Sequence, residues 1–418
     1  MARRSIGRFL ELLWMIVGLI DRRLRVPPAH RPGEDRIGRI LIVRLDLLGD
    51  LVMSLPAVDA VRRRWPEARI VLLCTPEAAG IAQFYPAIDM IYTYRPLEIR
   101  RLRWWLTPSS FWALLRLIRT LRAERFDLAL SLFGEFACLF AWASGARHRV
   151  GYAGEAYPAL FTLAVEGRRY KRAIAGREDH EVRWSGRIVE AAGAAAVGTL
   201  PRLVIPPELL RWRDDLLCEV GMSGKRYVVL SLGSHNGSAK RYRPAGWATV
   251  ARHLQERHNV GIVLTGIQDD RPLARIFLEH FGGDVVDLIG WTSLQQLVAL
   301  VAGAALVLTG DSAPAHLAAA AGTPVVVVFG PTSPRTYHPY TDRASVVHTN
   351  LPCSPCYDLL RTAECRLGLV EPLCMALLPT AVLLEEAEYW LSVPEAVDWN
   401  DGECALPRER LVTPLVFR

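Results

Sequence analysis

The sequence lacks several features that would place it in a simple class. It has only eight cysteines in 418 residues, so it is not a small secreted domain stapled by disulfides. No short-period repeat or low-complexity tract occurs, and the 22% of charged residues is ordinary for a globular protein, which excludes wholesale disorder. The first expected strand–loop–helix contains no G-x-G-x-x-G, which argues against a nucleotide-dependent oxidoreductase. The length is sufficient for two domains with their own cores.

The chain also lacks an apolar run of membrane-spanning length. The apolar stretch from Phe9 to Ile20 is shorter than the ~20 residues that a spanning helix needs. Its apolar residues recur at helical spacing, and Asp21-Arg22-Arg23 follows where a signal peptide would carry small residues. The pattern predicts an amphipathic helix and a proline-rich linker over 1–35, with the helix on a membrane surface or on the protein itself. A cleaved signal peptide is the alternative.

Positive charge is in excess and unevenly distributed. The formal net charge is +7, and arginines concentrate between residues 95 and 125. A basic surface favours an anionic partner. We predict that Arg101 and Arg103, beside Trp104 and Trp105, contact a phosphate-bearing substrate or anionic lipid head groups; a solvated helical face is the plainer interpretation. No nucleic-acid-binding module accompanies the charge, so nucleic acid is not an expected partner.

Strands and helices alternate along the chain in two successive arrays. In the first array, apolar runs predict strands at 39–44, 69–74, 88–92, 126–132 and 148–151, the last at a sheet edge. In the second array, they predict strands at 226–232, 260–265, 285–288, 305–309 and 324–329. Such alternation predicts an α/β fold of two Rossmann-like, doubly wound domains that face each other across a cleft.

A carboxylate follows the first strand. Leu45–Asp50 is a loop in which Gly49 would allow a tight turn, and Asp50 stands at the entrance of the next helix. Ligands of such sheets bind beyond the carboxyl ends of the strands, so Asp50 is placed to act as a general base toward a hydroxyl group. Asp46 is the competitor for this role, and a helix-capping aspartate is the structural alternative.

The strand at 226–232 is followed by a loop of small polar residues and then cations, from Gly233 to Arg243. Backbone N–H groups and hydroxyls such as that of Ser238 could bind phosphate oxygens, and Lys240 would add a positive charge for a leaving diphosphate. The Walker pattern G-x-x-x-x-G-K-[ST] is absent from this loop. A basic surface turn is the alternative interpretation.

The most specific segment runs from Gly310 to Thr332. A strand delivers Asp311 to the head of a small-residue helix, where Ser312 can cap the helix and Pro314 suits its first turn. The N–H groups near Ala313 and the helix dipole predict a diphosphate site. His316 would lie in the first turn near the same anion, although a lone histidine is usually structural.

These segments together resemble the ADP-heptose:lipopolysaccharide heptosyltransferase family, glycosyltransferase family 9. Ile40–Pro56 resembles the family's opening S/D-x-x-G-D loop, 239–242 its lysine loop, and Gly310–Thr332 its hallmark G-D-S/T segment ending in F-G-P-T. The resemblance implies a GT-B fold and a glycosyltransferase that transfers a heptose or related sugar from ADP-heptose to a lipopolysaccharide-core or similar lipid-linked glycan. It also implies that transfer is inverting and metal-independent, at the inner face of the cytoplasmic membrane.

The resemblance assigns roles to particular residues. It implies an acceptor-binding domain at 36–205 and a nucleotide-sugar-binding domain at 206–395, followed by a tail at 396–418 that can pack back on the first domain. Arg101 and Arg103 would contact the anionic acceptor. Asp50 would be the base, and Gln268 or Asp269 would lie near the donor ribose. The donor diphosphate would be surrounded by Ser238, Lys240, Asp311, Ser312, Ala313 and His316.

The sequence also departs from the family pattern. Ser131–Gly134 stands where the family usually has an acidic D-x-Q-G-like segment, and Arg243 replaces a common proline. A non-catalytic GT-B-like protein that binds a nucleotide or polysaccharide in an envelope assembly complex is the alternative function.

Four cysteines cluster late in the chain. Their spacing allows a structural zinc site, a disulfide or free thiols, and the residues concerned are Cys353, Cys356, Cys365 and Cys374. A zinc ion held by four thiolates has no open position, so no cofactor is expected in catalysis itself.

Overall fold

The protein is described from a computed structural model. The structure describes residues 32, 35–95, 108–134, 136–155, 157–167, 179–195, 202–234, 237–357, 364–394 and 407–412. The expected N-terminal helix and the two arginines Arg101 and Arg103 lie outside these ranges. The chain divides into two compact units, 1–198 and 199–418, and each is described by itself.

The first unit alternates strands and helices as the sequence predicts. Its strands are short apolar runs, and the central one, with the sequence RILIVR, is buried at all but its first residue. In chain order the elements are β1 (Arg39–Arg44), α2 (Leu48–Arg64), β2 (Arg69–Cys74), α3 (Pro76–Ala82), β3 (Met90–Thr93), α6 (Pro108–Ala123), β4 (Leu128–Phe133), α7 (Ala137–Ala143), β5 (His148–Tyr152), the 3-10 turn Pro158–Leu160, β6 (Leu163–Val165) and α8 (Glu181–Ala191).

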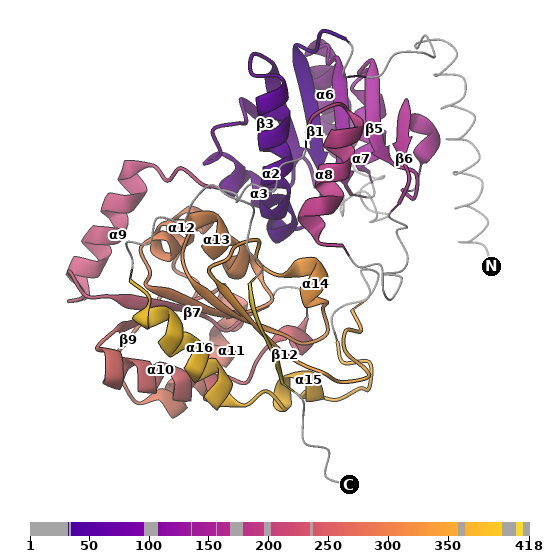
Figure 1. Ribbon diagram of the computed structural model, residues 1–418. Coiled ribbons are helices and arrows are strands. Elements are labelled where there is room, and N and C mark those ends of the chain that lie inside the picture. The colour runs from indigo at the N-terminus through magenta and orange to yellow at the C-terminus, as the bar shows by residue number, and fades with distance from the viewer. Residues whose placement is uncertain are drawn as a thin grey trace. The chain divides into compact units, whose positions relative to one another are not determined.

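The six strands of the first unit form one parallel sheet in the order β3-β2-β1-β4-β5-β6 (Figure 1). Leu41 and Val43 of β1 pack with side chains of α6 and α7, whereas α8 lies against α2 and contacts β4, β5 and β6. The expectation that 148–151 is an edge strand is wrong, because β6 pairs with β5 and continues the sheet.

The second unit repeats the pattern. Its elements are α9 (Pro207–Glu219), β7 (Tyr227–Ser231), the 3-10 turn η3 (Ser238–Lys240), α10 (Pro244–His258), β8 (Gly261–Thr265), the 3-10 turn η4 (Gln268–Asp270), α11 (Arg271–Phe281), β9 (Val285–Asp287), α12 (Leu294–Ala302), β10 (Leu306–Gly310), α13 (Ala313–Ala321), β11 (Val325–Phe329), α14 (Pro334–Tyr337), β12 (Ala344–Thr349), α15 (Leu373–Ala376), α16 (Thr380–Ser392) and β13 (Arg408–Val412).

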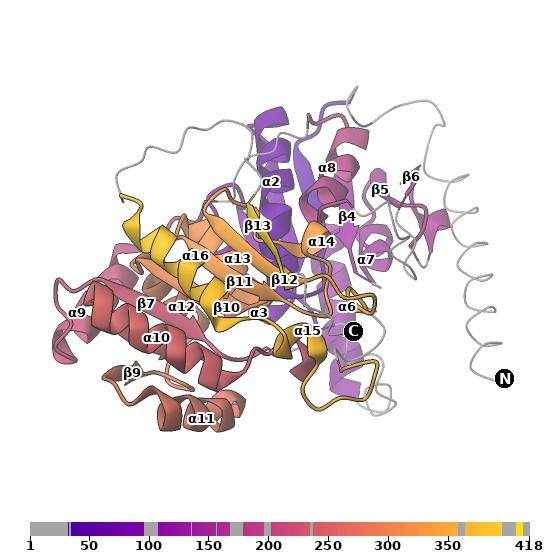
Figure 2. The same ribbon diagram turned by 60° about the horizontal axis from the view of Figure 1, so that its bottom comes forward.

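These strands form a second parallel sheet in the order β13-β12-β11-β10-β7-β8-β9. Strand β13 belongs to the tail that was expected to pack on the first domain, and instead it pairs in register with β12 of the second sheet. On one face of this sheet α10 lies beside both α11 and α16 (Figure 2).

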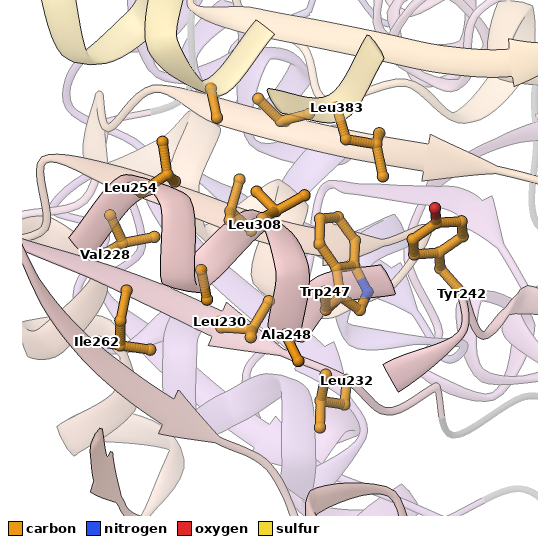
Figure 3. Close-up of a cluster of buried hydrophobic side chains, with 14 of the residues drawn as sticks. Val228, Leu230, Leu232, Tyr242, Trp247, Ala248, Leu254, Ile262, Leu308 and Leu383 are labelled. Atoms are coloured by element: carbon orange, nitrogen blue, oxygen red, sulfur yellow. The ribbon is translucent and has the colours of Figure 1, made fainter. Parts of the chain in front are cut away.

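The core of the second unit lies between these helices and the sheet. Trp247 of α10 is fully buried among Leu230 of β7, Leu308 of β10 and Leu383 of α16, with the Tyr242 ring 5.2 Å away (Figure 3). The continuous apolar runs VVLS and VVVVF produce strands that are buried on both faces, which is the usual pattern of a parallel sheet covered by helices. Among the described residues, no helix is both long enough and apolar enough to cross a membrane.

Candidate active site

Both sheets reverse their strand order at one point. In the first sheet the reversal lies between β1 and β4, and in the second it lies between β7 and β10. Open parallel sheets bind ligands at such switch points, beyond the carboxyl ends of the strands. The segments that follow β1, β7 and β10 carry Asp46 and Asp50 in the first unit, and Lys240 and Asp311 in the second. The main candidates predicted from the sequence therefore lie at the two switch points.

The first-unit site begins where β1 meets α2. Helix α2 starts at Leu48, so Gly49 lies inside the helix and makes no tight turn, contrary to expectation. Asp50 lies in the first turn, and the N-cap position belongs to Leu47, whose side chain makes no capping hydrogen bond. Asp50 is therefore not the N-cap residue of α2. Its negative charge lies at the positive end of the helix dipole, which stabilises it.

Arg44, the last residue of β1, connects three carboxylates. Its Nε donates to Asp46 Oδ1 at 2.8 Å, and its Nη2 donates to Glu181 Oε1 at 3.0 Å. The Asp50 Oδ1 atom lies 3.7 Å from the same Nη2, an ion pair beyond hydrogen-bond distance. Burial alone would lower the pKa of Arg44, but Asp46, Glu181 and Asp50 outweigh burial and raise it, so the guanidinium stays charged.

The protonation of Asp46 is set by this environment. Burial raises the pKa of Asp46 well above its ordinary value, against the opposing charge of Arg44, and the carboxylates of Asp50 and Glu181 raise it further. A carboxylate held by Arg44 and pushed toward protonation is a poorer proton acceptor than its neighbour Asp50. The geometry favours Asp50 over Asp46 as the base.

Two members of this cluster were missed by the sequence analysis. Arg44 could have been found, because a cation at the end of an otherwise apolar buried strand is unusual. Glu181 carries no local signal, since it lies 137 residues from Arg44 in the sequence and reaches it only through the packing of α8. Gly134, in the segment that departs from the family pattern, has a φ of +128° and lies against the Leu45 backbone, so that segment supports the Asp46 loop.

In the second unit, Lys240 and Asp311 form the centre of the site. The Lys240 Nζ atom lies 2.7 Å from Asp311 Oδ2, and Thr332 Oγ1 donates to the same oxygen at 2.6 Å. Lys240 is buried, with its Nζ atom 5.1 Å from the centre of the Tyr357 ring, so the interpretation as a basic surface turn is wrong. Gly310 is needed here, because a Cβ atom at this position would lie 2.7 Å from the Lys240 carbonyl oxygen.

Helix α13 begins beside this ion pair. Ser312 occupies its N-cap position but makes no capping hydrogen bond, contrary to expectation; its hydroxyl bonds Thr309 Oγ1 at 3.0 Å and the Gly310 carbonyl at 3.2 Å instead. Pro314 lies in the first turn, as expected. The N–H groups around Ala313 can therefore bind an anion, which the helix dipole also favours.

His316 lies buried in the same turn. Burial lowers its pKa to about 4; Asp311 opposes this effect, and the charges of Lys240 and His338 add to it. The imidazole is therefore neutral at physiological pH. Its Nδ1 atom has no hydrogen-bond partner among the residues that the structure describes. A neutral ring with an unbonded nitrogen beside Lys240 and Asp311 fits a ligand-binding role better than a purely structural one.

The other expected donor residues lie at the same edge of the second sheet. Ser238 is exposed in η3, two residues before Lys240. Gln268 and Asp269 are exposed in η4, directly after β8. The next residue, Asp270, is buried and accepts from the Ile267 N–H at 3.1 Å, so it serves the turn. The expected acceptor-binding residues, Arg101 and Arg103, lie outside the described residues.

The late cysteines line one small cavity of about 20 Å³ together with Ala239 and Pro331; they are Cys353, Cys356, Cys365 and Cys374. All four are free thiols in the structure. Burial raises the pKa of Cys374 to about 12 and also raises that of Cys356. Within the described ranges, no group of three or more His, Cys, Asp or Glu residues is arranged to hold a metal ion.

Fold and sites together define a class of protein. Each unit has the Rossmann strand order, the second has an anion site at a helix N-terminus, and the first has a buried cluster around a carboxylate. Two such units in one chain define an α/β enzyme of the GT-B type.

Comparison with known proteins gives the family. The model of glycosyltransferase family 9 (heptosyltransferase) matches residues 114–366, and the chain belongs to this family. It is 26% identical over 322 residues to lipopolysaccharide heptosyltransferase 2 of Salmonella typhimurium, a match that covers 74% of this chain and 87% of the relative. The protein of the same name from Escherichia coli K12 is also 26% identical, over 328 residues and with the same coverage.

Solved structures show the same fold. A family 9 glycosyltransferase from Veillonella parvula superimposes with a TM-score of 0.69 at 19% identity, covering 87% of this chain and 99% of that chain. The E. coli ADP-heptose lps heptosyltransferase II superimposes with a TM-score of 0.63 at 22% identity, covering 84% of this chain and 98% of that chain. The chain is a glycosyltransferase, as the sequence motifs predicted.

Proposed function

We propose that the chain transfers a heptose from ADP-heptose to the lipopolysaccharide core or a similar lipid-linked glycan, with inversion and without a catalytic metal. The names of its relatives support this substrate pair: two are lipopolysaccharide heptosyltransferases, and a structural neighbour is titled an ADP-heptose lps heptosyltransferase. The single observation that carries the proposal is the Lys240–Asp311 ion pair at the start of α13, where a sugar diphosphate would find both a cation and a helix N-terminus.

In the proposed donor site, Lys240 and the first N–H groups of α13 bind the diphosphate. Negative charge grows on the leaving diphosphate as the bond to the sugar breaks, and preorganised donors stabilise it most at that moment. Removing one such donor typically costs about 3–4 kcal/mol of transition-state stabilisation. The ammonium and the helix dipole thereby provide what a metal ion provides in other enzymes. Gln268 or Asp269, after β8, would contact the ribose.

In the proposed reaction, the acceptor hydroxyl attacks the anomeric carbon from the face opposite the diphosphate. The new bond joins that carbon to the acceptor oxygen, the bond to the diphosphate oxygen breaks, and ADP leaves. Asp50 takes the hydroxyl proton. Since attack and departure occur on opposite faces, the configuration at the anomeric carbon inverts.

The test compares Asp50→Asn with Asp46→Asn in the full chain. We expect Asp50→Asn to lower the transfer rate about 10²–10⁴-fold, the usual contribution of a general base, while ADP binds as before, because the proposed donor residues belong to the second unit. Asp46→Asn should lower the transfer rate less than Asp50→Asn does. The measurements are release of ADP with transfer to a lipid-linked acceptor, and calorimetry with ADP. Full transfer by Asp50→Asn would remove Asp50 from the mechanism, and absence of transfer by the native chain would favour a non-catalytic binding protein.

We further propose that the protein works as a peripheral protein on the inner face of the cytoplasmic membrane, where a lipid-linked acceptor would be found. Helix α6 supports this proposal. Phe111 and Trp112 are 45% and 57% exposed, and Arg116 and Arg119 are exposed one and two turns further along. Exposed aromatic rings next to arginines suit the interface of an anionic bilayer.

A further inference from the structure

Arg44 lies at the centre of a cluster of three carboxylates, those of Asp46, Asp50 and Glu181. The Arg44 side chain is 1% exposed and that of Glu181 is 0% exposed, whereas Asp50 is 15% exposed. A buried guanidinium loses its hydration and is stable only when carboxylates replace the lost water. Two carboxylates at hydrogen-bond distance, Asp46 and Glu181, already do this. The third, Asp50, is held by charge at 3.7 Å.

Helix α8 fixes Glu181 in this cluster. Glu181 is the first residue of α8, and the preceding His180 caps the helix by accepting from the Val182 N–H at 3.2 Å. Ser185 of α8 hydrogen-bonds Ser54 of α2 at 3.1 Å, and Ser54 donates to the Asp50 carbonyl at 2.9 Å. The helices that carry Glu181 and Asp50 are therefore linked one turn from the cluster.

The way in which Arg44 distributes its hydrogen bonds among the carboxylates affects the proton affinity of Asp50. A direct hydrogen bond from a guanidinium favours the anionic form of a carboxylate and lowers its proton affinity, an effect that burial outweighs at Asp46. Glu181 takes the Nη2 hydrogen bond of Arg44 that would otherwise be open to Asp50. Asp50 is thus oriented by the charge of Arg44 at 3.7 Å, and Arg44 lowers its proton affinity less than a direct hydrogen bond would.

We propose that Arg44 and Glu181 are positioning residues that set the orientation and basicity of the Asp50 carboxylate during sugar transfer. The inference rests on the proposed function, in which Asp50 takes the proton of the acceptor hydroxyl. Neither side chain touches substrate. The charged groups that face Asp50 in the described structure include Arg44 from β1, Asp46 from the following loop and Glu181 from α8.

The test is the pH dependence of kcat for the full chain and its variants. Glu181→Gln removes a negative charge and leaves Arg44 more strongly attached to Asp50, so the acidic limb of the profile should move down by about one pH unit, with a lower kcat. Arg44→Gln removes the positive charge, so the limb should move up by about one unit. The KM for the donor should stay unchanged in both.

Two further variants keep the test decisive. Asp127→Asn makes the same change from carboxylate to amide at the other end of β1, where Asp127 accepts from the Gly38 and Arg39 N–H groups, and it should leave the profile in place. If Arg44→Gln does not fold, Arg44→Lys replaces it. The lysine keeps the charge but cannot reach three carboxylates at once, so kcat should fall while the limb stays at its native pH.

The outcomes separate this inference from the proposed function. The positioning role is supported if the acidic limb of the pH profile moves down in Glu181→Gln and up in Arg44→Gln. General damage to the fold would not move the profile in opposite directions. Loss of activity without a shift, or shifts in the same direction, would overturn the positioning role even if Asp50→Asn is inactive. Full activity of Asp50→Asn would instead remove the role of Asp50 itself.

Discussion

At the scale of single residues, the buried groups of the proposed donor site differ in their charge. Lys240 and Asp311 form an ion pair at 2.7 Å, and the ammonium is also shared with the Tyr357 ring. His316 is buried beside them and is neutral, since its pKa is lowered to about 4. In the proposed donor site, a diphosphate beside Lys240 would compete with Asp311 for the ammonium, so Asp311 would lower the affinity for the donor and for the product ADP.

The protonation of His316 leads to a prediction about stability. Its pKa falls from 6.5 to about 4 on folding, so the unfolded chain binds more protons between these pH values, and acid destabilises the folded state. The full effect is about 3 kcal/mol. We expect the native chain to lose this free energy of unfolding between pH 6.5 and pH 4, and His316→Gln to lose less over the same range, as measured by denaturant titration. Identical pH slopes would show that His316 does not titrate in this way.

At the scale of elements, only some of the described helices have an N-terminus capped by a side chain. The helices α3 and α12 are capped by the side chains of Thr75 and Ser293, and α8 is capped by His180. Helices α2 and α13, which follow the switch-point strands β1 and β10, begin without a side-chain cap. Helices α9, α10 and α16 also begin without one, so the missing cap alone does not mark a site. Helix α13 differs from them in starting beside the Lys240–Asp311 ion pair.

Helix α6 leads to a prediction at this scale. Each basic residue near an anionic bilayer contributes about 1 kcal/mol to binding, so Arg116→Gln combined with Arg119→Gln should weaken binding to anionic vesicles about 30-fold. Trp112→Ala should weaken it further, because the indole would lose its place at the interface. The measurement is flotation with vesicles that contain anionic phospholipid. Trp291→Ala is the control, since Trp291 is 78% exposed on the second unit. Equal binding to neutral vesicles would contradict the proposed surface.

At the scale of the whole molecule, the strand pattern was the most predictable feature. Continuous apolar runs such as 39–44 and 69–74 match the bounds of β1 and β2, because a strand buried on both faces needs apolar residues throughout. The segments at the switch points could also be found, since Asp311 directly follows such a run and Asp50 and Lys240 follow within ten residues. The pairing of β13, the described part of the expected tail at 396–418, was not predicted, because it depends on a partner strand more than fifty residues earlier.

The parts of the site that could not be predicted are those made by distant segments. Glu181 reaches Arg44 from α8, and Thr332 reaches Asp311 from the loop after β11, and neither residue carries a periodic signal. Ser312 was expected to cap α13, but its hydroxyl finds Thr309 and Gly310 within its own turn. Local sequence identifies a residue that can form a hydrogen bond, whereas packing decides which partner it meets.

Metal dependence is a property of the whole molecule that chelation can test. We propose that transfer needs no metal and that any zinc held by the four late cysteines is structural. Chelation should therefore leave the transfer rate unchanged, and if zinc is bound it should lower the Tm. Cys365→Ser should reproduce the effect of the chelator on Tm. The measurements are metal analysis of the purified chain, a thermal melt and the transfer assay. Loss of transfer that added metal restores would contradict metal independence.

Strand β13 has a consequence for the solubility of the protein. Strand β13 reads Arg-Glu-Arg-Leu-Val, and Arg410 Nε pairs at 2.8 Å with Glu386, a carboxylate buried in α16. Its charged side chains close the end of the second sheet to other chains. Cleavage before Arg408 would expose the apolar strand β12. It would also remove Arg408 and Arg410, the two arginines that pair with the buried Glu386 carboxylate. Such a fragment would be prone to self-association, so β13 protects solubility as well as extending the second sheet.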